Sequence, residues 1–108
     1  MNNKEMIKSI IESSTLDQYL VGITKDSVVR RRSYLKEGFD GYVVIDFNLT
    51  QKSALDHEEE LFNTLTADKT RSPYKKYHNE KRDGSYKRAT GGIPEGEKYD
   101  LYIAWINK

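Results

Sequence analysis

The 108-residue chain contains no cysteine, which excludes disulfide bonds and thiolate metal sites. It has only two histidines, His57 and His78, and they lack the HxxxH spacing or any similar spacing that is typical of a zinc site. No apolar run is long enough to cross a bilayer, so we expect no membrane segment. The first residues, MNNKEMIKSIIESS, have no long apolar stretch that would indicate a signal peptide, and we expect a cytoplasmic protein.

The composition predicts a single small domain, residues 1–108. Apolar residues make up 36% of the chain and charged residues 32%, so we expect a small core and an ionic surface. The net charge of +1 predicts no particular partner by itself. The sequence contains neither internal repeats nor a low-complexity linker.

The hydrophobic periodicity predicts alternating helices and strands. Asp26 or Ser27 is suited to begin the second helix and Gly38 to end it, whereas the third helix is expected to begin at Ser53. These elements indicate an α+β fold, in which helices flank a small, mainly antiparallel sheet of three to four strands. The apolar run of the second strand indicates a central position in that sheet. The expected helices are 4–13, 27–36, 53–65 and 74–82, and the expected strands are 18–24, 41–47 and 98–106.

Glu58 lies near the middle of the apolar face of the predicted helix 53–65. A carboxylate on a buried face is unfavourable unless it is paired, hydrogen-bonded or bound to a cation. The functional interpretation is a ligand of Mg²⁺, which often takes one or two carboxylates. The alternatives are a salt bridge to an arginine of a neighbouring helix, or a rotated helix that exposes Glu58 to solvent.

Arg30 and Tyr34 are four residues apart on the predicted helix 27–36, so they share a face. A guanidinium and a phenol placed in this way can clamp a phosphate. The alternative is a solvated basic surface, which is the usual meaning of a run of three arginines. We expect Val28 and Leu35 to point toward the core.

Residues 69–88 form a basic segment with eight Lys or Arg against two acids, a local charge of +6. Cations follow a phosphate backbone, and interleaved tyrosines can stack on unpaired bases. The alternative is a solvated, flexible loop. If the segment binds nucleic acid together with the first basic helix, the expected contact residues are Arg31, Lys75, Lys76, Asn79, Lys81, Arg82, Lys87 and Arg88.

Residues 17–66 resemble the core of GIY-YIG nucleases, the module of UvrC excision nucleases and of some homing endonucleases. Val21 and Gly22 match the end of the YIG element, Arg30 follows the glycine by eight residues, and Tyr34 follows by four more. The family also has an alanine four residues before a metal-binding glutamate, and Ala54 and Glu58 match that spacing. Asn79 is similar to an asparagine that follows the glutamate helix in the family.

Two signature positions differ from the family pattern. Leu20 stands in place of the YIG tyrosine, and nothing between residues 1 and 18 reads as a GIY strand. The terminal strand, 98–106, is apolar enough to take the place of the missing strand. Tyr99 or Tyr102 would then supply a hydroxyl group to the site.

The resemblance implies a DNA endonuclease that uses one Mg²⁺. In that mechanism Glu58 holds the metal, Arg30 stabilises charge on the phosphate, and a tyrosine such as Tyr34 orients or deprotonates water. One alternative is a GIY-YIG-like domain that binds nucleic acid without cleaving it. The other is a small structural or partner-binding α+β protein. The sequence leaves the oligomeric state open.

Overall fold

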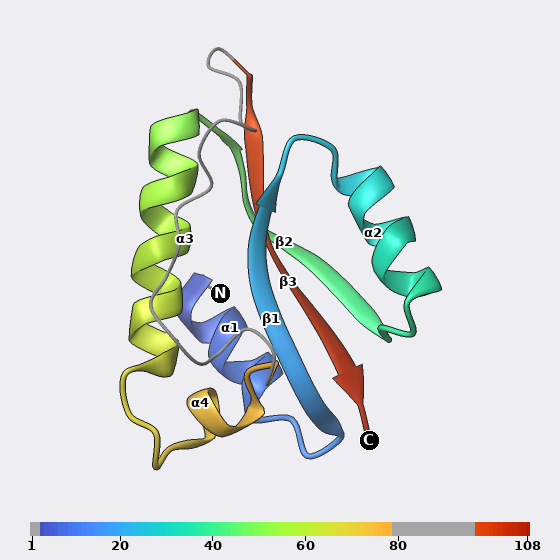
Figure 1. The fold of residues 1–108 in the computed structure, drawn as a ribbon, viewed down its shortest axis with the longest axis vertical. Helices are drawn as coiled ribbons and strands as arrows, with labels where there is room; N and C mark the ends of the chain where they lie inside the picture. The colour runs from blue at the N-terminus through green and yellow to red at the C-terminus, as the bar shows by residue number, and fades with distance from the viewer. Residues whose placement is uncertain (1–2, 79–96) are drawn as a thin grey trace.

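The computed structural model describes residues 3–78 and 97–108, and it shows the expected α+β architecture. Four helices flank a three-stranded antiparallel sheet within these residues (Figure 1). The elements follow in the order α1 (Asn3–Ile11), β1 (Leu16–Thr24), α2 (Ser27–Lys36), β2 (Gly41–Leu49), α3 (Gln51–Thr66), α4 (Ser72–Lys76) and β3 (Tyr99–Asn107).

The centre of the sheet is β3, which pairs with β1 on one side and with β2 on the other. The terminal strand, which the sequence suggested as a replacement for the missing strand, therefore pairs with β1. The expectation of a central second strand is wrong, because β2 lies at the edge of the sheet and, within residues 3–78 and 97–108, pairs only with β3. Ile103 and Ala104 of β3 are completely buried, as a strand covered on both edges and both faces requires.

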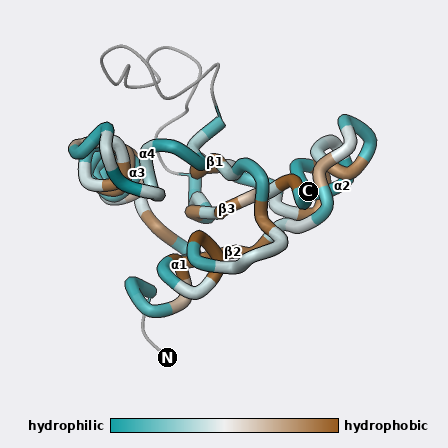
Figure 2. Tube along the Cα trace, turned by 90° about the horizontal axis from the view of Figure 1, so that it is seen from below, coloured by the Kyte–Doolittle hydropathy of each residue, from teal (hydrophilic) through white to brown (hydrophobic). Residues whose placement is uncertain are grey.

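The two faces of the sheet are covered unequally (Figure 2). Helices α1, α3 and α4 lie on one face, and α2 stands alone on the other. The larger part of the core lies beneath α1 and α3, where Ile7, Ile11, Phe62 and Leu65 pack toward the sheet. This asymmetry leaves α2 free of any buried residue.

Helix α2 is attached to the sheet by an aromatic contact instead of an aliphatic one. Val28 is 68% exposed and Leu35 is 39% exposed, so the expectation that they face the core is wrong. The ring of Tyr34 packs instead against Phe39, at a centroid distance of 4.7 Å, and against Tyr102 at 5.7 Å. The large tyrosine ring bridges the gap to the sheet and keeps the rest of the helix at the surface.

Local signals define the ends of the helices. The Asp26 carboxylate accepts from the amide of Val29 at 3.1 Å and caps α2, as expected. Gly38 adopts a φ of 97°, which favours glycine, directly after the helix. Helix α3 begins before the predicted Ser53, because the hydroxyl of Thr50 accepts from the Ser53 amide at 3.2 Å and provides the cap.

The outer edge of β1 is partly covered by residues 77–78. The His78 amide donates to the Tyr19 carbonyl at 2.7 Å, and the Val21 amide donates to the Tyr77 hydroxyl at 3.3 Å. The Tyr19 hydroxyl in turn donates to the carbonyl of Pro73. These bonds fix the end of α4 against the sheet.

None of the helices in the described residues is both long and apolar enough to cross a bilayer.

The central position of β3 predicts a large difference between two truncations. Ile103→Ala should lower the free energy of unfolding by about 2–5 kcal/mol, because it leaves a cavity under the middle of the sheet. The matched control, Val28→Ala on the outside of α2, should change it by less than about 0.5 kcal/mol. Urea denaturation of both variants is the measurement, and equal losses would contradict this description of the core.

Candidate active site

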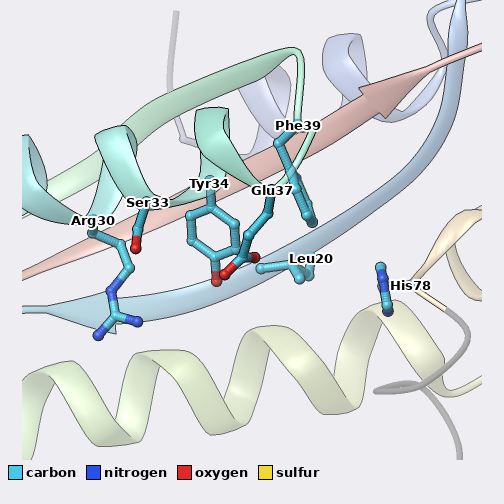
Figure 3. Close-up of a pocket in the computed structure, with 7 residues that line it drawn as sticks. All are labelled: Leu20, Arg30, Ser33, Tyr34, Glu37, Phe39 and His78. Carbon is cyan, nitrogen blue, oxygen red and sulfur yellow. The ribbon is translucent and has the colours of Figure 1, made fainter.

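Arg30 and Tyr34 meet in a cavity on the α2 side of the sheet. The cavity has a volume of about 300 Å³. Arg30 lies at one end, and Tyr34 lies between it and the opposite end (Figure 3). The expectation that these two side chains share a face that can hold a ligand is consistent with this placement. The residues that line the cavity are Leu20, Arg30, Ser33, Tyr34, Glu37, Phe39 and His78.

A pair of tyrosine hydroxyl groups stands beside the arginine. The hydroxyl oxygens of Tyr34 and Tyr102 lie 2.9 Å apart, so one donates a hydrogen bond to the other. Tyr102 belongs to β3, and its partner in the register of β1 is Gly22. Of the two tyrosines proposed to supply a hydroxyl, Tyr102 therefore contacts Tyr34, and its role in the site stays a prediction.

Gly22 is required by the position of the Tyr102 ring. A Cβ atom added at residue 22 would lie 2.5 Å from the Tyr102 hydroxyl oxygen and 2.7 Å from its Cζ. Only a residue without a side chain lets the phenol cross over β1 at this point. The glycine that carries the resemblance thus has a steric role toward the phenol of the neighbouring strand.

Tyr42, Ser27 and Asp100 hold the tyrosine pair in position. The ring of Tyr42 is stacked on that of Tyr102 at a centroid distance of 4.8 Å. The Tyr42 hydroxyl donates to Ser27 Oγ at 3.2 Å, and Ser27 Oγ donates to Asp100 Oδ2 at 2.7 Å. This chain of hydrogen bonds ties the first turn of α2 to both β2 and β3.

The surroundings of Tyr102 favour its neutral form. Burial raises the pKa of the Tyr102 phenol far above its ordinary value, the neighbouring Tyr34 raises it further, and the charge of Arg30 acts in the opposite direction. Burial likewise raises the pKa of Tyr42. Tyr102 therefore keeps its proton at neutral pH and can donate it in a hydrogen bond.

Glu58 approaches β1 from the face of the sheet that is opposite to α2. It is half-buried on α3, which agrees with its predicted place on the apolar side of that helix. Burial raises the pKa of Tyr77, the hydrogen bond from Val21 opposes the shift, and the nearby Glu58 carboxylate adds to it. Glu58 therefore lies near the Tyr77 hydroxyl, which binds the amide of Val21.

Arg30 and Glu58 thus approach neighbouring residues of β1. Arg30 lines the cavity together with Leu20, whereas Glu58 lies near the hydroxyl that binds Val21. Because α2 and α3 lie on opposite faces of the sheet, the two charged groups approach the outer edge of β1 from opposite faces. Glu58 itself is not among the residues that line the cavity.

The described residues can bind a magnesium ion only through a single protein carboxylate. No group of three or more His, Asp or Glu side chains is close enough to hold a metal in residues 3–78 and 97–108. A single carboxylate such as Glu58 still fits Mg²⁺, because this ion retains several waters and takes its other ligands from substrate phosphates.

The structure describes only some of the residues that were predicted to contact nucleic acid. Arg31 and Lys75 are exposed. The Lys76 ammonium donates to the carbonyl of Ile11 at 2.8 Å, and it lies 3.4 Å from that of Ser13, so it stabilises the C-terminal end of α1. The other predicted contacts lie outside the described residues, namely Asn79, Lys81, Arg82, Lys87 and Arg88.

Several residues of the site gave no signal in the sequence. Phe39 and His78 come to the cavity from the loop after α2 and from the residue after Tyr77. Ser27 and Asp100 are 73 residues apart and meet only because β3 lies beside the start of α2. Tyr42 could have been suggested by the apolar strand that contains it, but its pairing with Tyr102 depends on the register of β3.

Comparisons with protein-family models, with curated proteins and with solved structures found no match for this chain.

The close contact between Gly22 and Tyr102 predicts a strong coupling. Gly22→Ala should lower the free energy of unfolding by about 1–3 kcal/mol, because the new methyl group overlaps the phenol. In a Tyr102→Ala background the same change should cost much less. A double-mutant cycle from urea denaturation measures the coupling, and an equal cost in both backgrounds would refute the steric explanation.

The buried tyrosines predict a loss of stability at alkaline pH. Burial raises the pKa values of Tyr19, Tyr77 and Tyr102, so the folded chain holds these protons to higher pH than the unfolded chain. The unfolded phenols ionise near pH ~10. The free energy of unfolding should therefore be constant with respect to these groups below about pH 10 and fall above it.

Urea denaturation between about pH 8 and 11 measures this decline, with Tyr19→Phe as the comparison. The variant should show a smaller decline above about pH 10, since one shifted phenol has been removed. If both proteins lost stability with the same slope, ionisation of Tyr19 would not contribute.

Proposed function

We propose that this chain is a divergent GIY-YIG-like endonuclease that cleaves DNA phosphodiesters with one Mg²⁺ and acts in the cytoplasm. The observation that carries the proposal is the contact between the hydroxyl groups of Tyr34 and Tyr102 beside Arg30. It supports the proposal because Tyr102 comes from β3, the strand that we expect to take the place of the missing GIY strand. The tyrosine thus stands next to the glycine of the YIG-like element, Gly22.

Arg30 is the group that binds the phosphate. Arg30 is exposed and lines the cavity together with Tyr34, and its charge acts on the Tyr102 phenol. A planar guanidinium holds two phosphate oxygens at once and stabilises the negative charge that grows on them during hydrolysis. Helix α2 contributes four cations and no acid, so it attracts the backbone of DNA along its whole length.

The tyrosine pair orients the groups that react. Because Tyr102 stays neutral, its hydroxyl can donate to Tyr34, and the Tyr34 O–H is then free to donate to a water or phosphate oxygen. Tyr34 orients the water for attack on the phosphorus, and the proton that the water loses passes to bulk solvent. The Tyr42 ring and the Ser27–Asp100 bond keep the pair in place.

Glu58 is the residue that would hold the metal at the edge of β1. When bound, Mg²⁺ supplies positive charge to the phosphate and to the leaving oxygen. Glu58 reaches this edge near Val21, adjacent to the residue that lines the Arg30 cavity. A phosphate lying across the edge of β1 would contact the cation of Arg30 on one face and the Glu58 site on the other.

A second candidate function is binding of nucleic acid without cleavage. The observation that favours it is that Glu58 does not line the cavity of Arg30 and Tyr34. If the two sites do not act on one phosphate, the basic helix α2 still binds the DNA backbone.

Nicking of supercoiled plasmid in the presence of Mg²⁺ tests the proposal. Glu58→Gln and Arg30→Ala should each slow nicking by about 100-fold or more, because each removes a group that stabilises charge in the transition state. Glu60→Gln, a matched control on the exposed part of α3, should leave the rate unchanged. Thermal unfolding of each variant shows whether it remains folded.

Other outcomes select the alternatives. Binding of DNA whose logarithmic affinity falls steeply with the logarithm of salt concentration, without nicking and indifferent to Glu58→Gln, selects the binding function. Absence of binding at low salt rejects both and leaves a structural or partner-binding protein.

A further inference from the structure

The cavity beside Arg30 has a second end that the proposed hydrolysis does not use. In Figure 3 the side chains of Phe39 and His78 lie at the end away from Arg30, with Leu20 and Glu37 between. This end is formed by two rings, Leu20 and the Glu37 carboxylate lie toward the middle, and the other end carries a cation. A ligand that fills the whole cavity must therefore combine a flat apolar part with an anion.

The rings of Phe39 and His78 are held in a common orientation. Their planes differ by 14° and their centroids are 6.2 Å apart. Phe39 is buried beneath Tyr34, and the half-buried His78 offers the accessible surface. A flat ring that enters the cavity parallel to these planes can stack on His78 without disturbing the core.

Among the residues that the structure describes, His78 also carries a polar atom without a partner. Its Nδ1 is buried and has no hydrogen-bond partner within residues 3–78 and 97–108. A buried polar group without a partner is unfavourable, and such a group in a native protein calls for an explanation. A ligand in this cavity that shifts the ring and bonds to Nδ1 would relieve that cost.

We infer that this end of the cavity binds one unpaired nucleobase, which stacks on His78 while its phosphate lies at Arg30. The cavity volume of about 300 Å³ suits a single base and excludes a base pair. The base must therefore leave a duplex or come from a single strand. Glu37, which lies between the two ends of the cavity, accepts hydrogen bonds only, and this favours adenine, cytosine or guanine, whose exocyclic amino groups donate.

The inference rests on the proposed action on nucleic acid and narrows its substrate to strands with an unpaired nucleotide at the cleaved phosphate. Stacking of a base on a protein ring makes a measurable contribution to affinity in single-strand binding proteins. A protein that depends on it binds a single strand more tightly than a duplex of the same sequence.

The test uses an oligonucleotide with one 2-aminopurine, a fluorescent adenine analogue whose emission changes when its stacking changes. Binding is measured in EDTA, so that hydrolysis has no part in the result. The wild-type protein should bind the single strand and change its fluorescence, and should bind the duplex more weakly. His78→Ala should weaken binding of the single strand about tenfold and abolish the fluorescence change.

Three further variants separate the effect of the pocket on binding from general effects. His57→Ala removes the other histidine, which is exposed on α3, and should leave both affinity and fluorescence unchanged. Ser33→Phe fills the cavity from the exposed surface of α2 and should act like His78→Ala without removing any core contact. Glu37→Gln should reduce the preference for adenine over thymine at the tested position.

The outcomes distinguish this inference from the proposed function. An unchanged signal in both His78→Ala and Ser33→Phe, or equal affinity for single strand and duplex, overturns the base pocket while the nuclease proposal stands. A specific fluorescence signal from a protein that fails to nick plasmid supports the base pocket and rejects the nuclease. Absence of binding to every oligonucleotide overturns both.

Discussion

The pairing of β3 with both β1 and β2 is the constraint on which the rest of the structure depends. Without β3 the other two strands share no hydrogen bonds, and neither α2 nor α3 has a continuous surface to pack on. The register of β3 places Tyr102 opposite Gly22. The same strand also places Asp100 where Ser27, at the start of α2, can donate to it. One strand therefore both holds the sheet together and brings the candidate site into existence.

The sequence predicts those features of the fold that depend on neighbouring residues. The Asp26 cap and the glycine after α2 are local signals, and the predicted bounds of the helix between them agree with the observed ones. The inner position of Glu58 follows from helix geometry in the same way. The order of the strands could not be predicted in this way, because β2 and β3 are similarly apolar and only long-range packing decides which of them is central.

In the candidate site, too, local spacing predicts some residues, whereas long-range contacts determine the others. Arg30 and Tyr34 are one helical turn apart and could be brought together from sequence. Tyr99 and Tyr102 were equal candidates, because the choice depends on which face of β3 meets α2. They are three residues apart and so point to opposite faces. His78 could not be assigned to the cavity, because a hydrogen bond across the edge of β1 positions it.

Another consequence of a central β3 concerns the time at which the protein can fold. Strands β1 and β2 are synthesised many residues before β3, yet neither has a partner in the sheet until residues 99–107 have left the ribosome. The apolar sides of β1 and α3 are exposed during that interval and have little to bury against. The sheet therefore cannot form until β3 has been synthesised, and the long sequence separation that its pairing bridges makes its docking the slow step.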